Sequence, residues 1–162
     1  MYDDARKITL INLDICERNN WINSVCLCYR VLGDLDANIG QHDNARSNYE
    51  KALENVQNIS NQPVLIQILS AIGSWCARWD KVTTAEDYLN KALRYAVKGG
   101  YQLYKVDIYI GLAWMYFISG NTRKSEEKAQ SAKQMSEEMG YYWGKLDAEQ
   151  LLSLNFSQTL SG

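Results

Sequence analysis

The chain has 162 residues, of which 46% are hydrophobic and 22% are charged, and its formal net charge is −2. This length and composition are typical of one globular domain with a substantial apolar core. The 17 basic and 19 acidic residues are mixed along the chain. We therefore expect neither nucleic acid nor an anionic membrane surface as a partner.

The sequence also argues against insertion in a membrane and against secretion. Its longest apolar run, Ile108–Ile118, is interrupted by Gly111 and is shorter than the roughly 20 residues of a membrane-spanning helix. The N-terminus begins with acidic residues instead of a basic segment followed by an apolar run, so it does not resemble a secretory signal. We interpret the four cysteines as reduced thiols and expect a cytoplasmic protein.

Two amphipathic helical patterns, joined by a break at Gly40–His42, fill the stretch Tyr29–Leu53. Small residues of this stretch return 40 positions later and again after a further 40 positions. In the first helices they are Gly33, Gly73 and Ala113, and in the second helices they are Ala45, Ala85, Ser125, Ala52, Ala92 and Ala132. Self-similarity at such a period indicates an array of stacked helix pairs, because no pair buries its apolar stripe alone.

In chain order, the pattern predicts an unpaired second helix, three helix pairs, a capping helix and a frayed tail. Their ranges are 2–18 for the unpaired helix, 21–59, 63–99 and 101–139 for the pairs, 141–156 for the capping helix and 157–162 for the tail. Pro63 suits the first turn of a helix, and Gly99–Gly100 and Gly140 suit helix ends. We therefore predict an all-α solenoid of about eight helices.

The repeated pattern resembles the tetratricopeptide repeat, a helix-turn-helix unit. The residues that carry the resemblance are Tyr29, Leu32, Gly33, Ala45, Tyr49 and Ala52. The resemblance implies a right-handed superhelix of antiparallel helix pairs. The period of 40 positions exceeds the usual length of about 34 and is similar to the long units of bacterial STAND-class signalling ATPases, maltose-regulator-like transcription factors and kinesin light chains. A segment of a larger bacterial signalling or regulatory protein is therefore expected.

The sequence offers no constellation for catalysis. The single histidine, His42, lies in a predicted turn, where a solvent-facing side chain is the ordinary case. Cys26 and Cys28 are too close in sequence for the usual metal-binding pair, and their side chains diverge on a helix. Glycine-rich phosphate-binding motifs are absent from the sequence. We therefore predict a protein that is not an enzyme and that has no metal and no cofactor.

The resemblance implies that the first helices line a concave groove. By register, the groove residues are Arg30, Asp34, Asn38, Gln67, Ser70, Ser74, Arg78, Asp107, Ile110, Trp114 and Phe117, with Leu27, Ile118, Asp147, Gln150 and Leu154 beside them. The groove is thus expected to be polar at one end and apolar at the other. Chaperone-binding members of the family clamp a peptide carboxylate with Lys and Asn on successive first helices. That clamp is not kept here, because Arg30 and Asp34 occupy the comparable positions in the first unit.

Two interpretations of Ile110, Trp114 and Phe117 remain open. Their i, i+4, i+7 spacing would let them anchor an apolar segment of a partner, while Arg30 and Arg78 bind the charged groups of that segment. Alternatively, the first helix of the third pair is apolar on all sides because the capping helix, the superhelical turn or another protomer covers it.

We predict from these patterns a scaffold module that binds a protein or peptide in its groove. One alternative is a sensor in which Arg30, Asp34, Ser70, Ser74 and Arg78 bind a small effector. Another is a structural spacer or oligomerisation element. Self-association through exposed solenoid ends is also expected to be possible.

Overall fold

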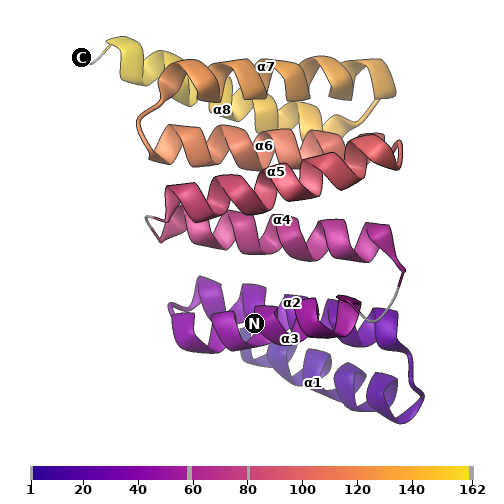
Figure 1. Ribbon diagram of the computed structural model, residues 1–162. Coiled ribbons are helices and arrows are strands. Elements are labelled where there is room, and N and C mark those ends of the chain that lie inside the picture. The colour runs from indigo at the N-terminus through magenta and orange to yellow at the C-terminus, as the bar shows by residue number, and fades with distance from the viewer. Residues whose placement is uncertain (1, 58–59, 80, 161–162) are drawn as a thin grey trace.

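The computed structural model describes residues 2–57, 60–79 and 81–160. These residues form eight helices and no strand, which confirms the predicted all-α solenoid (Figure 1). The helices are α1 Tyr2–Arg18, α2 Ile22–Asn38, α3 His42–Gln57, α4 Gln62–Arg78, α5 Val82–Lys98, α6 Gln102–Ile118, α7 Thr122–Met139 and α8 Tyr142–Leu160.

The helices start at strictly regular intervals. Their first positions are 2, 22, 42, 62, 82, 102, 122 and 142, so each helix pair repeats the register of the pair before it. Gly40 and Gly120 end their helices with φ of 77° and 75°, and Asn20 takes the same left-handed conformation with φ of 56°. Glycine reaches this region without steric cost, and asparagine tolerates it better than most residues. Left-handed residues thus stand in the turns after α1, α2, α5, α6 and α7.

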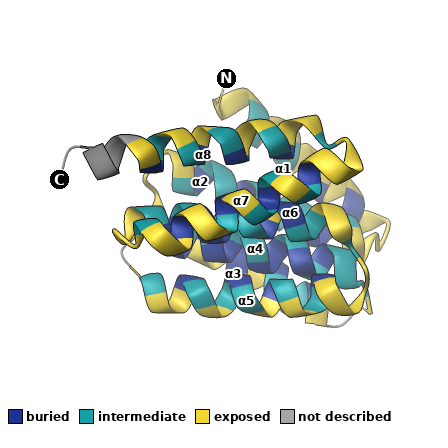
Figure 2. Ribbon diagram, turned by 90° about the horizontal axis from the view of Figure 1, so that it is seen from above, coloured by how far each residue is buried: buried dark blue, intermediate teal, exposed yellow. Residues whose placement is uncertain are grey.

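The helices stack in one continuous array (Figure 1). The pairs are α2 with α3, α4 with α5, and α6 with α7, and the first helices α2, α4, α6 and α8 also contact one another in succession. Helix α1 packs on α2, and α8 packs on α6 and α7. Viewed along the stack, the buried residues lie between neighbouring helices and the exposed residues lie on the rim (Figure 2).

Close approach within a pair depends on the small residues of the repeat. A Cβ atom on Gly33 would lie 2.6 Å from the ring of Tyr49, and one on Gly73 would lie 2.7 Å from Cγ of Leu89. In the third pair the equivalent residue is Ala113, which is fully buried. The small side chains therefore set the distance between the helices at which the larger side chains fill the core.

Polar contacts join neighbouring units at residues 30 positions apart. The side chain of Arg6 on α1 forms an ion pair with buried Asp36 on α2. The hydroxyl of Tyr116 on α6 donates to Glu86 on α5 at 2.5 Å. Asn155 on α8 donates to Ser125 on α7 at 3.0 Å. Each contact joins a second helix to the first helix of the next unit.

One helix boundary differs from the predicted one by more than one residue. Helix α8 continues to Leu160, so the tail predicted from residue 157 is wrong for residues 157–160. No glycine or proline stands between Gly144 and Gly162 to stop the helix earlier. Helix α3 is described as far as Gln57, and its predicted end at residue 59 lies outside the described residues, as does the turn residue at position 80. None of the described helices has the length and apolarity needed to cross a membrane.

We expect Gly73→Leu to lower the free energy of unfolding by about 1–3 kcal/mol, because the added side chain overpacks the contact between α4 and α5. Chemical denaturation followed by circular dichroism measures the change. The double variant Gly73→Leu/Leu89→Ala is the control, since removing the side chain beside Gly73 should recover part of the loss. Unchanged stability of the single variant would contradict the register.

Candidate functional site

The first helices enclose a polar hollow of about 490 Å³ on α2, α4 and α6. Tyr49 of α3 also reaches it. The lining residues are Arg30, Asp34, Ala37, Asn38, Tyr49, Gln67, Ser70, Ala71, Ser74, Trp75, Arg78, Tyr104 and Asp107. We call this hollow the polar pocket. It lies where stacked first helices present equivalent positions side by side.

Of the eleven predicted groove residues, the structure brings eight together around the polar pocket. They are Arg30, Asp34, Asn38, Gln67, Ser70, Ser74, Arg78 and Asp107. They occupy equivalent positions, 40 residues apart, on the first helices α2, α4 and α6, so the period of the sequence is enough to group them. Neighbouring first helices are also joined across this surface, because Arg78 donates to the side-chain oxygen of Asn38 at 3.3 Å.

The other three predicted residues lie elsewhere. Ile110 is buried in a cluster that includes Ala148 and Leu151 of α8, and Trp114 and Phe117 pack against the same cluster. The rings of Trp114 and Phe117 meet edge to face with their centroids 5.7 Å apart. The apolar side of α6 thus contacts the last helix, and these three side chains do not line the polar pocket.

Asp34 is the central acceptor of the polar pocket. The Tyr49 hydroxyl donates to its Oδ1 at 2.7 Å, and the guanidinium of Arg30, one turn away on α2, donates to its Oδ2 at 2.5 Å. Burial raises the pKa of Asp34, and the Tyr49 hydrogen bond and the charges of Arg30 and Arg78 oppose this rise. Burial and the neighbouring carboxylate raise the pKa of the Tyr49 hydroxyl, which stays a donor.

The far wall of the polar pocket is also held by hydrogen bonds between helices. Gln67 on α4 donates to the hydroxyl of Tyr104 on α6 at 3.2 Å. Tyr141 donates to Asp107 at 3.2 Å, and burial raises the pKa of that carboxyl. The walls of the polar pocket are thus fixed in place by contacts between successive units.

Three polar atoms at the polar pocket are buried without a hydrogen-bond partner among the described residues: Nε of Arg30, Oγ of Ser70 and Nε1 of Trp75. Each of these groups has a hydrogen to donate. A buried donor without an acceptor costs about 1–3 kcal/mol, so such groups call for an explanation. All three belong to residues that line the polar pocket, so a ligand with acceptors is one way to satisfy them.

Sequence reasoning missed the aromatic walls of the polar pocket. Tyr49 was named only among the residues that carry the repeat pattern, and neither Trp75 nor Tyr104 was expected in the groove. Trp75 follows predicted Ser74 directly, and Tyr104 lies one turn before predicted Asp107. A wider inward-facing arc on each first helix would have included both.

A second hollow, of about 260 Å³, lies between α3, α4 and α5 and shares Tyr49 and Trp75 with the polar pocket. The rings of these two residues are tilted, with centroids 5.7 Å apart. The guanidinium of Arg46 lies 6.0 Å from the Trp75 ring centroid. Two aromatic rings therefore separate the two hollows.

The described side chains offer little for catalysis. His42 lies away from the polar pocket, with its ring centroid 3.2 Å from that of Trp79. Burial raises the pKa of the Cys26 thiol to about 11, so this cysteine is no nucleophile at neutral pH. The described part of the chain holds no group of three or more His, Cys, Asp or Glu side chains that could bind a metal ion.

Comparison with known proteins agrees with this architecture. A family model of the tetratricopeptide repeat matches residues 24–96, which cover most of α2 through α5. Tetratricopeptide repeats generally mediate interactions between proteins and are typically non-catalytic. A search of curated proteins finds no match to the chain. The eight helices thus form an α-solenoid, of which residues 24–96 match the tetratricopeptide-repeat model.

We expect the stability of the chain to depend on the ionisation of Asp34. Burial raises the pKa of this group above its usual 3.8, so the folded chain binds the proton more tightly than the unfolded chain. The free energy of unfolding should therefore fall as the pH rises from 3.8 through the folded pKa. Asp34→Asn removes this contribution, and the stability of the wild type relative to this variant should fall over the same range.

Chemical denaturation of both proteins at a series of pH values measures this difference. Asp87→Asn, at an exposed aspartate of α5, provides the control. A difference that grows with pH would show that the charges of Arg30 and Arg78 outweigh burial, and would contradict the prediction.

Proposed function

We propose that the chain is a non-catalytic scaffold module that binds a protein or peptide in the polar pocket. The observation that carries this proposal is the set of three buried donors, on Arg30, Ser70 and Trp75, that have no acceptor among the described residues. The tetratricopeptide match to residues 24–96 supports it, because such repeats generally bind proteins.

The chemistry of the polar pocket suits an extended peptide segment. Carbonyl or carboxylate oxygens of the segment would accept from Arg30, Ser70 and Trp75, while Asp34 and Asp107 offer acceptors for its N–H groups. Both signs of charge are present, so the peptide backbone, which carries donors and acceptors alternately, is a good match. We place the partner here rather than over Trp114, because α8 packs against that side of α6.

The even spacing of the helices supports one repeat unit, a helix pair of constant register, over the whole chain. On this basis we further propose that the chain belongs with the long tetratricopeptide-like units and serves as a segment of a larger bacterial signalling or regulatory protein in the cytoplasm. Within it, residues 21–59, 63–99 and 101–139 act as the three repeats, between the unpaired α1 and the capping α8.

The dimensions of the polar pocket favour a second candidate function. Its volume of about 490 Å³ lies within the range of small-ligand sites, about 300–1,000 Å³. A small acid could satisfy the same donors and act as an effector of a regulator. This sensor differs from the peptide-binding module in needing no partner protein.

Selection of a random peptide library on the full chain, followed by fluorescence polarisation with the selected peptides, tests the proposed function. We expect Ser70→Ala to weaken binding about 2- to 12-fold, which corresponds to one neutral hydrogen bond of about 0.5–1.5 kcal/mol. Arg30→Ala should weaken binding about 10-fold or more, because a charged donor is lost.

The stability of the Ser70→Ala variant separates binding from folding. The Ser70 hydroxyl has no partner in the described structure, so its removal should leave the melting temperature unchanged or raise it. Ser47→Ala, at an exposed serine of α3, should change neither binding nor melting. Selected peptides that bind both pocket variants undiminished would contradict the proposal, and stabilisation by small acids without any peptide binder would favour the sensor.

A further inference from the structure

One contact of the repeat is missing at the junction of the first and second units. In the junctions before and after it, a second helix contacts the next first helix through side chains 30 positions apart. These are Arg6 with Asp36, and Glu86 with Tyr116. The equivalent residues of the middle junction are Arg46 on α3 and Cys76 on α4. No hydrogen bond or ion pair joins these two side chains in the described structure, and both line the second hollow.

Cys76 leaves open the space that a tyrosine fills one period later. Tyr116 is buried, and the ammonium group of Lys124 on α7 lies 4.9 Å from its ring centroid. Cys76 and Thr84 stand at the equivalent positions, and both line the second hollow. A cysteine side chain lacks the whole ring of a tyrosine. The second hollow therefore has the place of a missing aromatic ring.

The remaining walls of the second hollow suit such a ring. They are formed by apolar and aromatic side chains: Tyr49, Leu53, Ile72, Trp75 and Tyr88. Aromatic rings attract one another in edge-to-face and offset arrangements. The volume of about 260 Å³ lies just below the range of ordinary ligand sites, about 300–1,000 Å³. A ligand with a single ring therefore fits this hollow better than a larger one.

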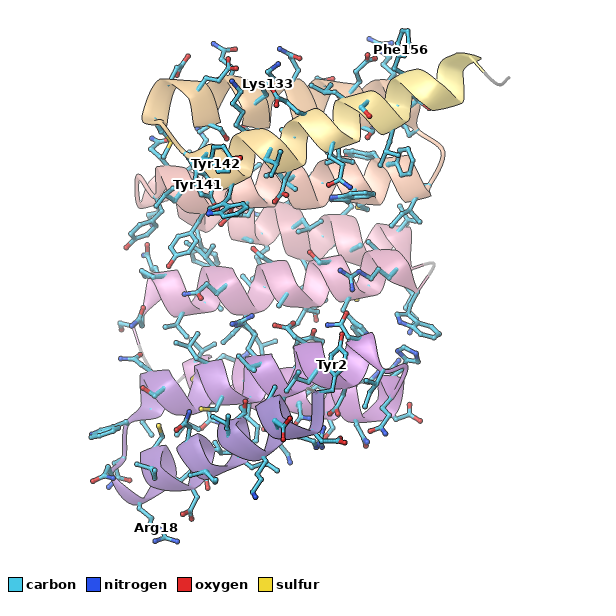
Figure 3. The ribbon with its side chains drawn as sticks, turned by 180° about the vertical axis from the view of Figure 1, so that it is seen from behind. Tyr2, Arg18, Lys133, Tyr141, Tyr142 and Phe156 are labelled. Carbon is cyan, nitrogen blue, oxygen red and sulfur yellow. The ribbon has the colours of Figure 1, made fainter. Side chains whose placement is uncertain are left out.

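The second hollow lies inside the array. All of its lining residues come from α3, α4 and α5, or from Lys81 directly before α5. These helices lie between α1, which carries Arg18 on one side of the stack, and α7, which carries Lys133 on the other (Figure 3). The walls of the second hollow are therefore complete within this chain.

The charged residues of the second hollow are positive on balance. Arg46 and Lys81 line it together with one carboxylate, that of Glu50, and all three residues are exposed. Neither Arg46 nor Lys81 forms an ion pair within the described part of the chain. Burial raises the pKa of the Cys76 thiol, and the charges of Lys81 and Arg46 oppose this rise. Both cations thus lie close enough to the hollow to act on an anion inside it.

We propose that the second hollow binds a small aromatic carboxylic acid. The ring of the acid takes the place that the Tyr116 ring has in the next junction. Its carboxylate accepts hydrogen bonds from the guanidinium of Arg46, and Lys81 adds a second cation. The preceding junction shows the same pairing within the chain, because Asp36 accepts from Arg6 there. The site goes beyond the proposed function, since neither Arg46 nor Lys81 lines the polar pocket.

An arginine at this position favours a carboxylate that is attached to a ring. A guanidinium group offers parallel N–H donors that match the two oxygens of a carboxylate. The Arg46 guanidinium lies 6.0 Å from the Trp75 ring centroid, so a ring that packs against Trp75 brings its carboxylate next to these donors. A ring without the acid, or an acid without the ring, would make only half of these contacts.

Titration of the full isotope-labelled chain with 3-phenylpropionate, followed by two-dimensional NMR, tests the proposal. We expect saturable shifts of the amide signals of Trp75, Cys76 and Lys81, with a dissociation constant of about 1 mM or below. Butyrate, which lacks the ring, and 3-phenylpropionamide, which lacks the charge, should each bind at least about tenfold more weakly.

Two variants of the second hollow should lose the acid for different reasons. Arg46→Gln removes the charged donor and should weaken the binding of 3-phenylpropionate about tenfold or more. Cys76→Tyr fills the hollow with a ring and should abolish binding. Arg94→Gln, at an exposed arginine of α5, is the matched control and should bind like the wild type.

The double variant Arg46→Glu/Cys76→Tyr separates loss of the site from loss of the fold. It copies the contact in which Tyr116 donates to Glu86. We therefore expect it to melt at or above the temperature of the wild type and yet to bind no 3-phenylpropionate. Circular dichroism measures the melting temperature.

Three results would overturn the proposal. The first is the absence of saturable shifts with 3-phenylpropionate up to about 10 mM. The second is undiminished binding of this acid to Arg46→Gln. The third is binding that is lost in Arg30→Ala but kept in both variants of the second hollow, because it would place the acid in the polar pocket.

Discussion

The structure depends on the close approach of the two helices in each pair. Where Gly33 faces Tyr49 and Gly73 faces Leu89, there is no room for another carbon atom between the helices. This contact recurs from one unit to the next and fixes both the spacing of the helices and their rotation about their own axes. Once the rotation is fixed, the residues that face the next unit and those that face the polar pocket are fixed as well.

The polar pocket is a product of repetition rather than of any single element. Equivalent positions of successive first helices lie side by side, as the hydrogen bond between Arg78 and Asn38 shows. The same positions carry different side chains in each unit, for example Arg30 in the first and Ser70 in the second. A common scaffold thus arranges a non-repeating set of donors and acceptors, which is the requirement for recognising a specific sequence of groups on a ligand.

Periodicity allowed the helices and most of the polar pocket to be predicted, because both follow from register. It could not show that Tyr49 and Trp75 reach the polar pocket, since the tilt of side chains at the border between core and groove depends on how far apart the units stand. It also left open whether Trp114 faces a partner or the last helix, because a pattern of apolar residues does not reveal what covers them. The continuation of α8 to Leu160 was missed because the sequence has no residue that marks where the helix ends.

Tyr49 and Trp75 form a partition between two hollows at the junction of the first and second units. The two rings are side chains, so their positions depend on rotation about side-chain bonds and on the distance between α3 and α4. Space gained on one side of the rings is space lost on the other. A change in the orientation of these two rings would therefore change the volumes of the polar pocket and of the second hollow in opposite directions.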